Sequence, residues 1–172
     1  MNYNIFSIIS SKLKDNQVKS ICLLKDTQWK FGIKSQINWY NKNIKRNDVH
    51  ILLYIKTKLI GYVLLRKRTC NINKMTVESK YLLFDTIIID KKFRGKKLSN
   101  LLMRFTNTLT KQSGYFSFLM THKEPVSFYE KFGWTKLKAS NIFVKDHLFT
   151  GYGMTYNQNN LRDTKYYFYT KR

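Results

Sequence analysis

The feature that most constrains the fold is the stretch FDTIIIDKKFRGKKLSNLLMRF, residues 84–105. Its apolar beginning belongs to YLLFDTIIID, where hydrophobic residues would occupy both faces of an extended chain, as in a central strand covered on each side. A short basic loop follows. Apolar side chains then recur at helical spacing, at Leu98, Leu101, Leu102, Phe105 and Leu109. A strand that leads so directly into an amphipathic helix predicts a mixed α/β domain.

The rest of the chain agrees with this fold class. YNIFSIIS predicts a strand, and residues 17–44 predict two short helices with a bend between Asp26 and Gly32. Two apolar runs around the turn at residues 56–58 predict a hairpin. YFSFLMT predicts another strand, and Pro125 suits the first turn of a helix that ends near Gly133. Weaker strand signals follow, and we expect the last, KYYFYTK, to be a buried strand without a stacking role. We therefore expect one domain over residues 1–172, built around one twisted sheet.

The charge of the chain is unusual for its size. Among 172 residues there are 32 Lys and Arg but 10 Asp and Glu, which gives a net charge of +22. One explanation is a biased coding sequence rich in Lys, Asn and Ile, and the other is a polyanionic partner such as nucleic acid. The even spread of the basic residues favours the first, so a nucleic-acid partner stays open but is not preferred.

Other partners are less well supported. Cys22 and Cys70 lie far apart without a CxxC motif or a histidine cluster, so we expect reduced thiols and no metal site. The first residues lack a basic segment and a cleavage site, and no apolar run approaches the ~20 residues of a membrane span. These patterns predict a soluble, cytoplasmic protein.

The basic loop predicts an anion-binding site. Five Lys and Arg residues fall between positions 91 and 97, where the first N–H groups of the following helix are free and its dipole is positive. Gly95 allows the backbone to approach an anion closely. Neither GxxxxGK[ST] nor GxGxxG is present, which argues against a nucleoside triphosphate loop and a dinucleotide fold. The alternative is a solvated basic turn.

Two segments together resemble a known family. IIIDKKFRGKKLSNLLMRF, followed by SFYEKFGW, is similar to the acetyl-CoA-binding core of the GCN5-related N-acetyltransferases (GNAT). The resemblance is clear over about residues 50–137 and implies a central twisted, mostly antiparallel sheet flanked by helices. It also implies acetyl-CoA as co-substrate, with the family pattern [RQ]xxGx[GA] falling on Arg94, Gly95, Lys96, Lys97, Leu98 and Ser99. Lys97 and Ser99 depart from the pattern, since the family prefers Gly and then Gly or Ala there.

The resemblance implies two catalytic residues. Tyr129 in FYEKFGW corresponds to a tyrosine that protonates the leaving thiolate, and its alternative is an aromatic packed between helix and sheet. Asp85 lies nine residues before Arg94, where relatives often carry an acid that deprotonates the substrate amine. A carboxylate within LLFDTIII is costly to bury, and desolvation would raise its pKa and suit it to a base. Its alternative is an ion pair with one of the many basic residues.

Other site residues follow from the same resemblance. Ile87, Ile88 and Ile89 would line the acetyl and pantetheine arm, largely through their main chain, and His122 would contact the cofactor or act as a second base. A surface histidine is the preferred alternative there. Gln36 and Trp39 lie in the helical region that forms one wall of the acceptor site in this fold, although a core position is favoured for Trp39.

The implied reaction is acetyl transfer from acetyl-CoA to a primary amine of a small molecule, such as an amino sugar or a nucleotide-linked sugar. The charge of +22 disfavours polycationic acceptors. Two alternatives stay open: an amine carried by aminoacyl-tRNA or a ribosomal protein, or a non-catalytic anion-binding module on the same fold. The sequence leaves the choice between monomer and homodimer open.

Overall fold

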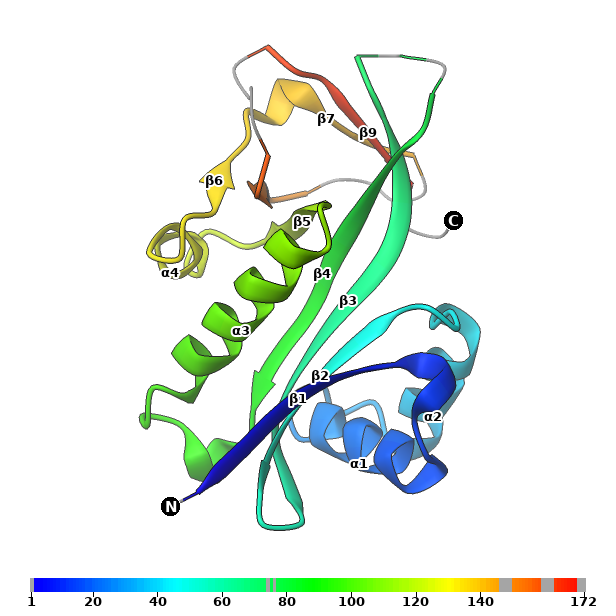
Figure 1. Cartoon of the computed structure of the whole chain (residues 1–172), viewed down its shortest axis with the longest axis vertical. Helices are drawn as coiled ribbons and strands as arrows, with labels where there is room; N and C mark the ends of the chain where they lie inside the picture. Colours follow the sequence, from blue (N-terminus) through cyan, green and yellow to red (C-terminus); the bar gives the residue numbers. More distant parts are fainter. Residues whose placement is uncertain (1, 74, 76, 146–149, 159–162, 170–172) are drawn as a thin grey trace. The chain divides into compact units, whose positions relative to one another are not determined.

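The structure of the protein is a computed structural model, shown in Figure 1, that describes residues 2–73, 75, 77–145, 150–158 and 163–169. The chain divides into two compact units. The first contains residues Met1–Arg66 and Thr86–Thr106, and the second contains Lys67–Asp85 and Asn107–Arg172. Strands β3 (Lys58–Ile72) and β4 (Ser79–Ile89) and helix α3 (Leu98–Gln112) run through both units. The single-domain expectation therefore stays a prediction.

The first unit is built on antiparallel strands. β1 (Tyr3–Ile9) pairs with β2 (Val49–Ile55) along its whole length, and β2 pairs with β3 through the tight turn at Lys56, whose φ is +52°. Between β1 and β2 the chain forms a short 3-10 turn (Ser10–Lys12) and helices α1 (Asp15–Asp26) and α2 (Ile33–Asn43), which pack against each other. The two predicted helices, their bend and the hairpin are confirmed.

Apolar residues cover both faces of this sheet. On one face, Ile21 and Leu24 of α1 join Leu52, Tyr62 and other strand residues in a buried cluster. On the other, Gly61 leaves room for neighbouring side chains, because a Cβ there would lie 2.9 Å from Ile89 Cδ1 and 3.2 Å from Leu102 Cδ1. Strand β3 therefore has α1 over one face and the first turns of α3 over the other, as Figure 1 shows.

The second unit adds strands to β3 and β4. β5 (Phe116–Thr121) runs parallel to β4, and β8 (Tyr152–Tyr156) pairs antiparallel with β5 and with the short β6 (Thr135–Lys136). β9 (Tyr166–Tyr169) is antiparallel to β3, and β7 (Ile142–Val144) is parallel to β9. Helix α4 (Val126–Glu130) follows Pro125, and a 3-10 turn spans Ala139–Asn141. The predicted mixed α/β fold with a mostly antiparallel sheet flanked by helices is thus confirmed.

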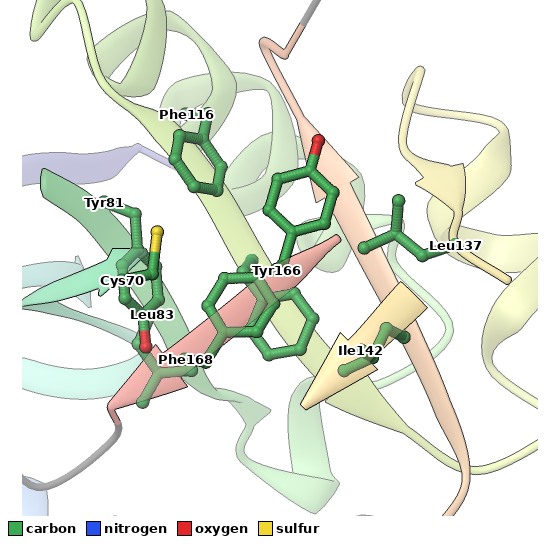
Figure 2. Packing of buried hydrophobic residues seen from close by; sticks show 9 residues of the cluster. Cys70, Tyr81, Leu83, Phe116, Leu137, Ile142, Tyr166 and Phe168 are labelled. Atoms are coloured by element: carbon green, nitrogen blue, oxygen red, sulfur yellow. The ribbon is translucent and has the colours of Figure 1, made fainter. Parts of the chain in front are cut away.

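The core of the second unit is aromatic. Figure 2 shows Tyr81, Phe116, Tyr166 and Phe168 pointing toward one another from three strands. The rings of Phe118 and Phe168 stack 3.7 Å apart, and Tyr81 meets Phe168 edge to face at 5.0 Å. Large rings with few rotatable bonds fill such a layer efficiently. No helix among the described residues is long and apolar enough to cross a membrane.

Candidate active site

The loop between β4 and α3 is fixed at its first residue. The Asp90 N–H donates to the Ile60 carbonyl at 2.8 Å, and the Asp90 carboxylate accepts the Lys92 N–H at 3.0 Å. Lys58 Nζ lies 2.8 Å from the same carboxylate. Burial by itself would raise the pKa of Asp90, but the hydrogen bonds from Lys58 and Lys92 outweigh it and hold that pKa below its usual range. Asp90 therefore links the end of β4 to Lys58, the first residue of β3 after the hairpin turn.

Arg94 connects the loop to the segment between α1 and α2. Its Nη2 donates to Gln28 Oε1 at 2.6 Å, and its Nε donates to the Ile89 carbonyl at 3.3 Å. The Gln28 segment is itself held, because the amide nitrogen of Gln36 donates to the Trp29 carbonyl at 2.8 Å. The guanidinium thus has a defined position beside the loop backbone.

The loop backbone leaves donors available. Gly95 and Lys97 adopt left-handed conformations, with φ of +78° and +57°. Within the described part of the chain, the N–H groups of Gly95, Lys96 and Lys97 donate to no backbone oxygen. The 15-residue helix α3 begins at Leu98 and adds the N–H groups of Leu98 and Ser99, whereas the Asn100 N–H donates to the Lys97 carbonyl at 3.0 Å. Unpaired N–H groups in left-handed turns at a helix N-terminus form a concave site for an anion.

Tyr129 lies in an aromatic cluster on α4. It is 8% exposed, and its ring contacts those of Phe84, Phe128 and Trp134 at 5.9, 5.3 and 6.0 Å. Burial raises the pKa of its hydroxyl to about 12. Among the described residues this hydroxyl has no hydrogen-bond partner. Tyr129 thus presents a protonated hydroxyl on a rigidly packed ring.

Asn107 of α3 supports this cluster. It accepts a hydrogen bond from Trp134 Nε1 at 3.1 Å and donates one to the Phe132 carbonyl at 2.8 Å. Both partners follow α4 in the chain, so one buried amide holds the chain on the C-terminal side of Tyr129 against α3.

The expectation that Asp85 is buried is wrong. Its side chain is exposed, so the cost of burying a carboxylate does not arise there. The described pairing of β4 with β5 ends at Leu83 and Phe118, two residues before Asp85. Strand alternation also places Asp85 on the face of β4 opposite Phe84, the residue that contacts Tyr129.

With this geometry in place, comparison with known proteins decides the family. The sequence model of the Acetyltransferase (GNAT) domain matches residues 9–156. The chain belongs to the GNAT acetyltransferase family. The resemblance inferred from the two sequence motifs is therefore confirmed.

Solved structures agree on the GNAT fold. Escherichia coli ElaA is 17% identical, with a TM-score of 0.65 and coverage of 91% of this chain and 100% of that one. YhbS, a GNAT N-acetyltransferase from E. coli solved with CoA, is 12% identical, with a TM-score of 0.67 and coverage of 98% and 91%. PaiA N-acetyltransferase from Thermoplasma acidophilum, solved with coenzyme A, is 15% identical, with a TM-score of 0.57 and coverage of 92% and 100%. No curated protein matches the sequence.

Other residues predicted from the GNAT resemblance have mixed environments. Ile88 and Ile89 are buried, and Ile88 belongs to the cluster beneath α1, so their side chains are not available to a ligand. Leu98 is buried too, whereas Lys96 and Lys97 are exposed and Ile87 and Ser99 are half-buried. His122 is exposed and lies just beyond the end of β5, which fits the alternative that it is a surface histidine.

Gln36 and Trp39 have structural contacts. Gln36 is 4% exposed and bonds the Trp29 carbonyl. Trp39 is half-buried against the α1 cluster, with Lys25 Nζ 3.7 Å from its ring centroid. These contacts fit the core alternative for Trp39, and an acceptor-binding role for either residue stays a prediction.

Sequence reasoning missed four residues that shape the GNAT loop and cluster. Lys58, Asp90 and Asn107 fix backbone segments, and Gln28 holds Arg94. An aspartate between a strand and a turn is a recognisable capping signal, so the role of Asp90 was predictable from the sequence. The other three act on residues at least 25 positions away and carry no local signal.

Proposed function

We propose that this chain is an acetyl-CoA-dependent N-acetyltransferase that acetylates the primary amine of a small molecule. The observation that carries the proposal is the loop after β4, where free N–H groups, two left-handed residues and the N-terminus of α3 converge. Family membership supports the same conclusion.

In this proposal the loop holds the diphosphate of acetyl-CoA. The N–H groups of Gly95, Lys96 and Lys97 donate to its oxygens, and Arg94 contributes charge. The departure from glycine at Lys97 does not change the backbone, because Lys97 already adopts the left-handed conformation at φ +57° that glycine would favour. The conformation costs about 1–2 kcal/mol for a residue with a Cβ, and the loop still presents its donors. Ser99 keeps its N–H for the same purpose.

Transfer begins when the neutral amine attacks the thioester carbon, which forms the C–N bond, and ends when the C–S bond breaks. The amine loses one proton and the leaving thiolate gains one. Asp85 is the proposed acceptor of the amine proton, directly or through water, and the exposure of its carboxylate is compatible with that role. Main-chain groups of Ile87, Ile88 and Ile89 are the proposed contacts to the acyl arm.

Tyr129 is the proposed donor to the leaving sulfur. A hydroxyl with a pKa of about 12 stays protonated throughout the working pH range, so it is always available as a donor. Because an ordinary thiol has a pKa of about 8.5, full proton transfer from Tyr129 to the thiolate is unfavourable. We therefore expect Tyr129 to stabilise the developing thiolate by a hydrogen bond, with the proton ultimately supplied by solvent.

The acceptor is proposed to be a small amine without several positive charges. A protein with a net charge of +22 repels polycations, whereas neutral or phosphorylated amines are tolerated. Gln36 would then act indirectly, because its bond to the Trp29 carbonyl fixes the α1–α2 segment.

The test of cofactor binding is thermal unfolding with acetyl-CoA and with CoA at two salt concentrations. A ligand at 100 times its Kd adds about 2.7 kcal/mol, which raises Tm clearly. Gly95→Ala should reduce this rise. Gly114→Ala is the matched control, because both glycines have φ near +70 to +80° with open space around a Cβ. Both variants lose similar stability, but only the first places a methyl group where the loop backbone would approach the diphosphate. If millimolar acetyl-CoA leaves Tm unchanged, the proposal fails.

The test of chemistry is release of free CoA thiol with a panel of small amines. Asp85→Asn should lower kcat by about 10²–10⁴-fold, the usual contribution of one acid–base group. Tyr129→Phe should lower kcat by about 10²–10³-fold, the usual effect of losing one hydrogen-bond donor to a developing charge. Tyr166→Phe, at a buried tyrosine of the aromatic core, controls for the loss of a buried hydroxyl. Unchanged kcat in Tyr129→Phe would remove Tyr129 from the mechanism and leave cofactor binding intact.

A further inference from the structure

The last described strand has two different faces. Tyr166 and Phe168 of β9 point into the aromatic core, together with Ile142 of β7 and Cys70 of β3, as Figure 2 shows. Side chains alternate along a strand, so the residues between them lie on the opposite face. We call this opposite side the aromatic face. Its residues are Thr69, Asn71, Phe143, Lys145, Tyr167 and Tyr169.

The register brings these residues into two rows. Phe143 pairs with Tyr167, which pairs with Asn71, and the two rings stack with centroids 4.6 Å apart and planes 9° apart. In the next row Tyr169 pairs with Thr69, and Lys145 Nζ lies 5.5 Å from the Tyr169 ring centroid. Phe143 is 42% exposed and Lys145 is exposed, while both tyrosines are half-buried.

This combination fits one class of ligand. Aromatic rings on an exposed sheet stack with nucleobases of any sequence, and lysines beside them neutralise phosphates. Thr69 and Asn71 are polar, and none of the six residues of the aromatic face is acidic. We propose that the aromatic face binds single-stranded nucleic acid.

A second copy of the chain fits the face less well. Protein interfaces are depleted of lysine at their centre, yet Lys145 lies over a ring of this face. Two chains of net charge +22 also repel each other. The same charge attracts a polyanion at long range. Nucleic-acid binding would therefore give the excess of basic residues a function, whereas a biased composition explains the excess without one.

The proposal is independent of the proposed acetyl transfer. None of its residues belongs to the loop after β4 or to the Tyr129 cluster, and no cofactor is required. It revises the expectation of a buried C-terminal strand without a stacking role, because within the described strand β9 Tyr166 and Phe168 are fully buried while Tyr167 and Tyr169 are half-buried.

The test is fluorescence anisotropy with a labelled 15-nucleotide oligo(U) RNA, the matching oligo(dT) and a duplex of equal length. We expect both single strands to bind more tightly than the duplex, and the ratio of the two affinities to show whether RNA or DNA is preferred. Phe143→Thr should weaken binding about 5- to 150-fold, the range for loss of one stacking ring. Phe143→Tyr keeps the ring and should bind as the parent does. Threonine suits a strand, and circular dichroism checks the fold.

Two controls separate stacking from general charge. Phe31→Thr removes an aromatic that is 71% exposed in the α1–α2 segment, outside the face, and should leave binding unchanged. Lys145→Gln should reduce the slope of log K against log salt by about 0.7, as for loss of one phosphate contact. Lys111→Gln, at a lysine 5.9 Å from the Tyr156 ring, should leave that slope unchanged.

Three results would overturn the proposal. The first is absence of binding to either single strand at low salt. The second is equal binding by Phe143→Thr and the parent, which would make the attraction purely electrostatic. The third is a dimer in light scattering that Phe143→Thr dissociates, which would make the face an interface between copies.

Discussion

His50 makes the stability of the protein depend on pH in a direction that the structure fixes. Its imidazole is fully buried, with Nε2 2.8 Å from Ser10 Oγ and Nδ1 2.8 Å from Tyr62 Oη. Burial lowers the pKa of His50 from 6.5 to about 4, since the protonated ring loses its hydration. The nearby Asp48 carboxylate opposes this shift, and the Lys25 ammonium adds to it.

The sign and size follow from proton linkage. Because the folded-state pKa lies below the unfolded-state value, the unfolded chain binds more protons between pH 6.5 and 4. The contribution of His50 is complete above pH 6.5 and is lost as the pH falls toward 4. A shift of this size corresponds to about 3 kcal/mol in full, of which about 2 kcal/mol is already lost at pH 5.

Urea unfolding at pH 7.5 and pH 5 measures this loss. Other groups titrate in the same range, so the informative quantity is the difference between the parent protein and His50→Gln, which has no imidazole. That difference should shrink by about 2 kcal/mol between the two pH values. His122→Gln, at an exposed ring, should behave as the parent does. If His50→Gln loses as much stability as the parent on acidification, His50 does not titrate as its burial predicts and the reasoning is refuted.

Three substitutions test the loop and the sheet. Lys97→Gly relieves the left-handed strain at φ +57° and should raise the free energy of unfolding by about 1 kcal/mol in urea titration, and a loss of stability would contradict this. Gln28→Ala removes the 2.6 Å hydrogen bond with Arg94 and should weaken acetyl-CoA binding about 2- to 10-fold, as measured by calorimetry, while Tm stays nearly unchanged. An unaltered Kd would show that this hydrogen bond is not needed for binding. Gly61→Ala places a Cβ 2.9 Å from Ile89 Cδ1 and should cost about 1–3 kcal/mol by thermal unfolding, whereas a parent-like Tm would mean that the side chains there yield easily.

Local patterns determined the elements of this protein. The apolar run before Asp90, the basic loop and the helical spacing after Leu98 each lie within one short segment, so β4, the loop and α3 were predictable from neighbouring residues. The left-handed backbone at Gly95 is likewise a local property, because glycine adopts it without a Cβ clash. The two motifs also sufficed to indicate the family, since their residues and order are read directly from the chain.

Only the tertiary structure decided the environments of the predicted site residues. Asp85 is exposed although its neighbours Phe84 and Thr86 are buried, and no pattern around residue 85 encodes which face of β4 other segments cover. Arg94 is held by the side chain of Gln28, which lies 66 residues away in the chain. Tyr167 and Phe168 have different environments because they lie on opposite faces of β9, and the face with Phe168 packs into the core. Periodicity along a chain specifies that a segment is a strand or a helix. Burial, hydrogen-bond partners and pKa depend on segments brought together from far along the chain, and those were decided by packing.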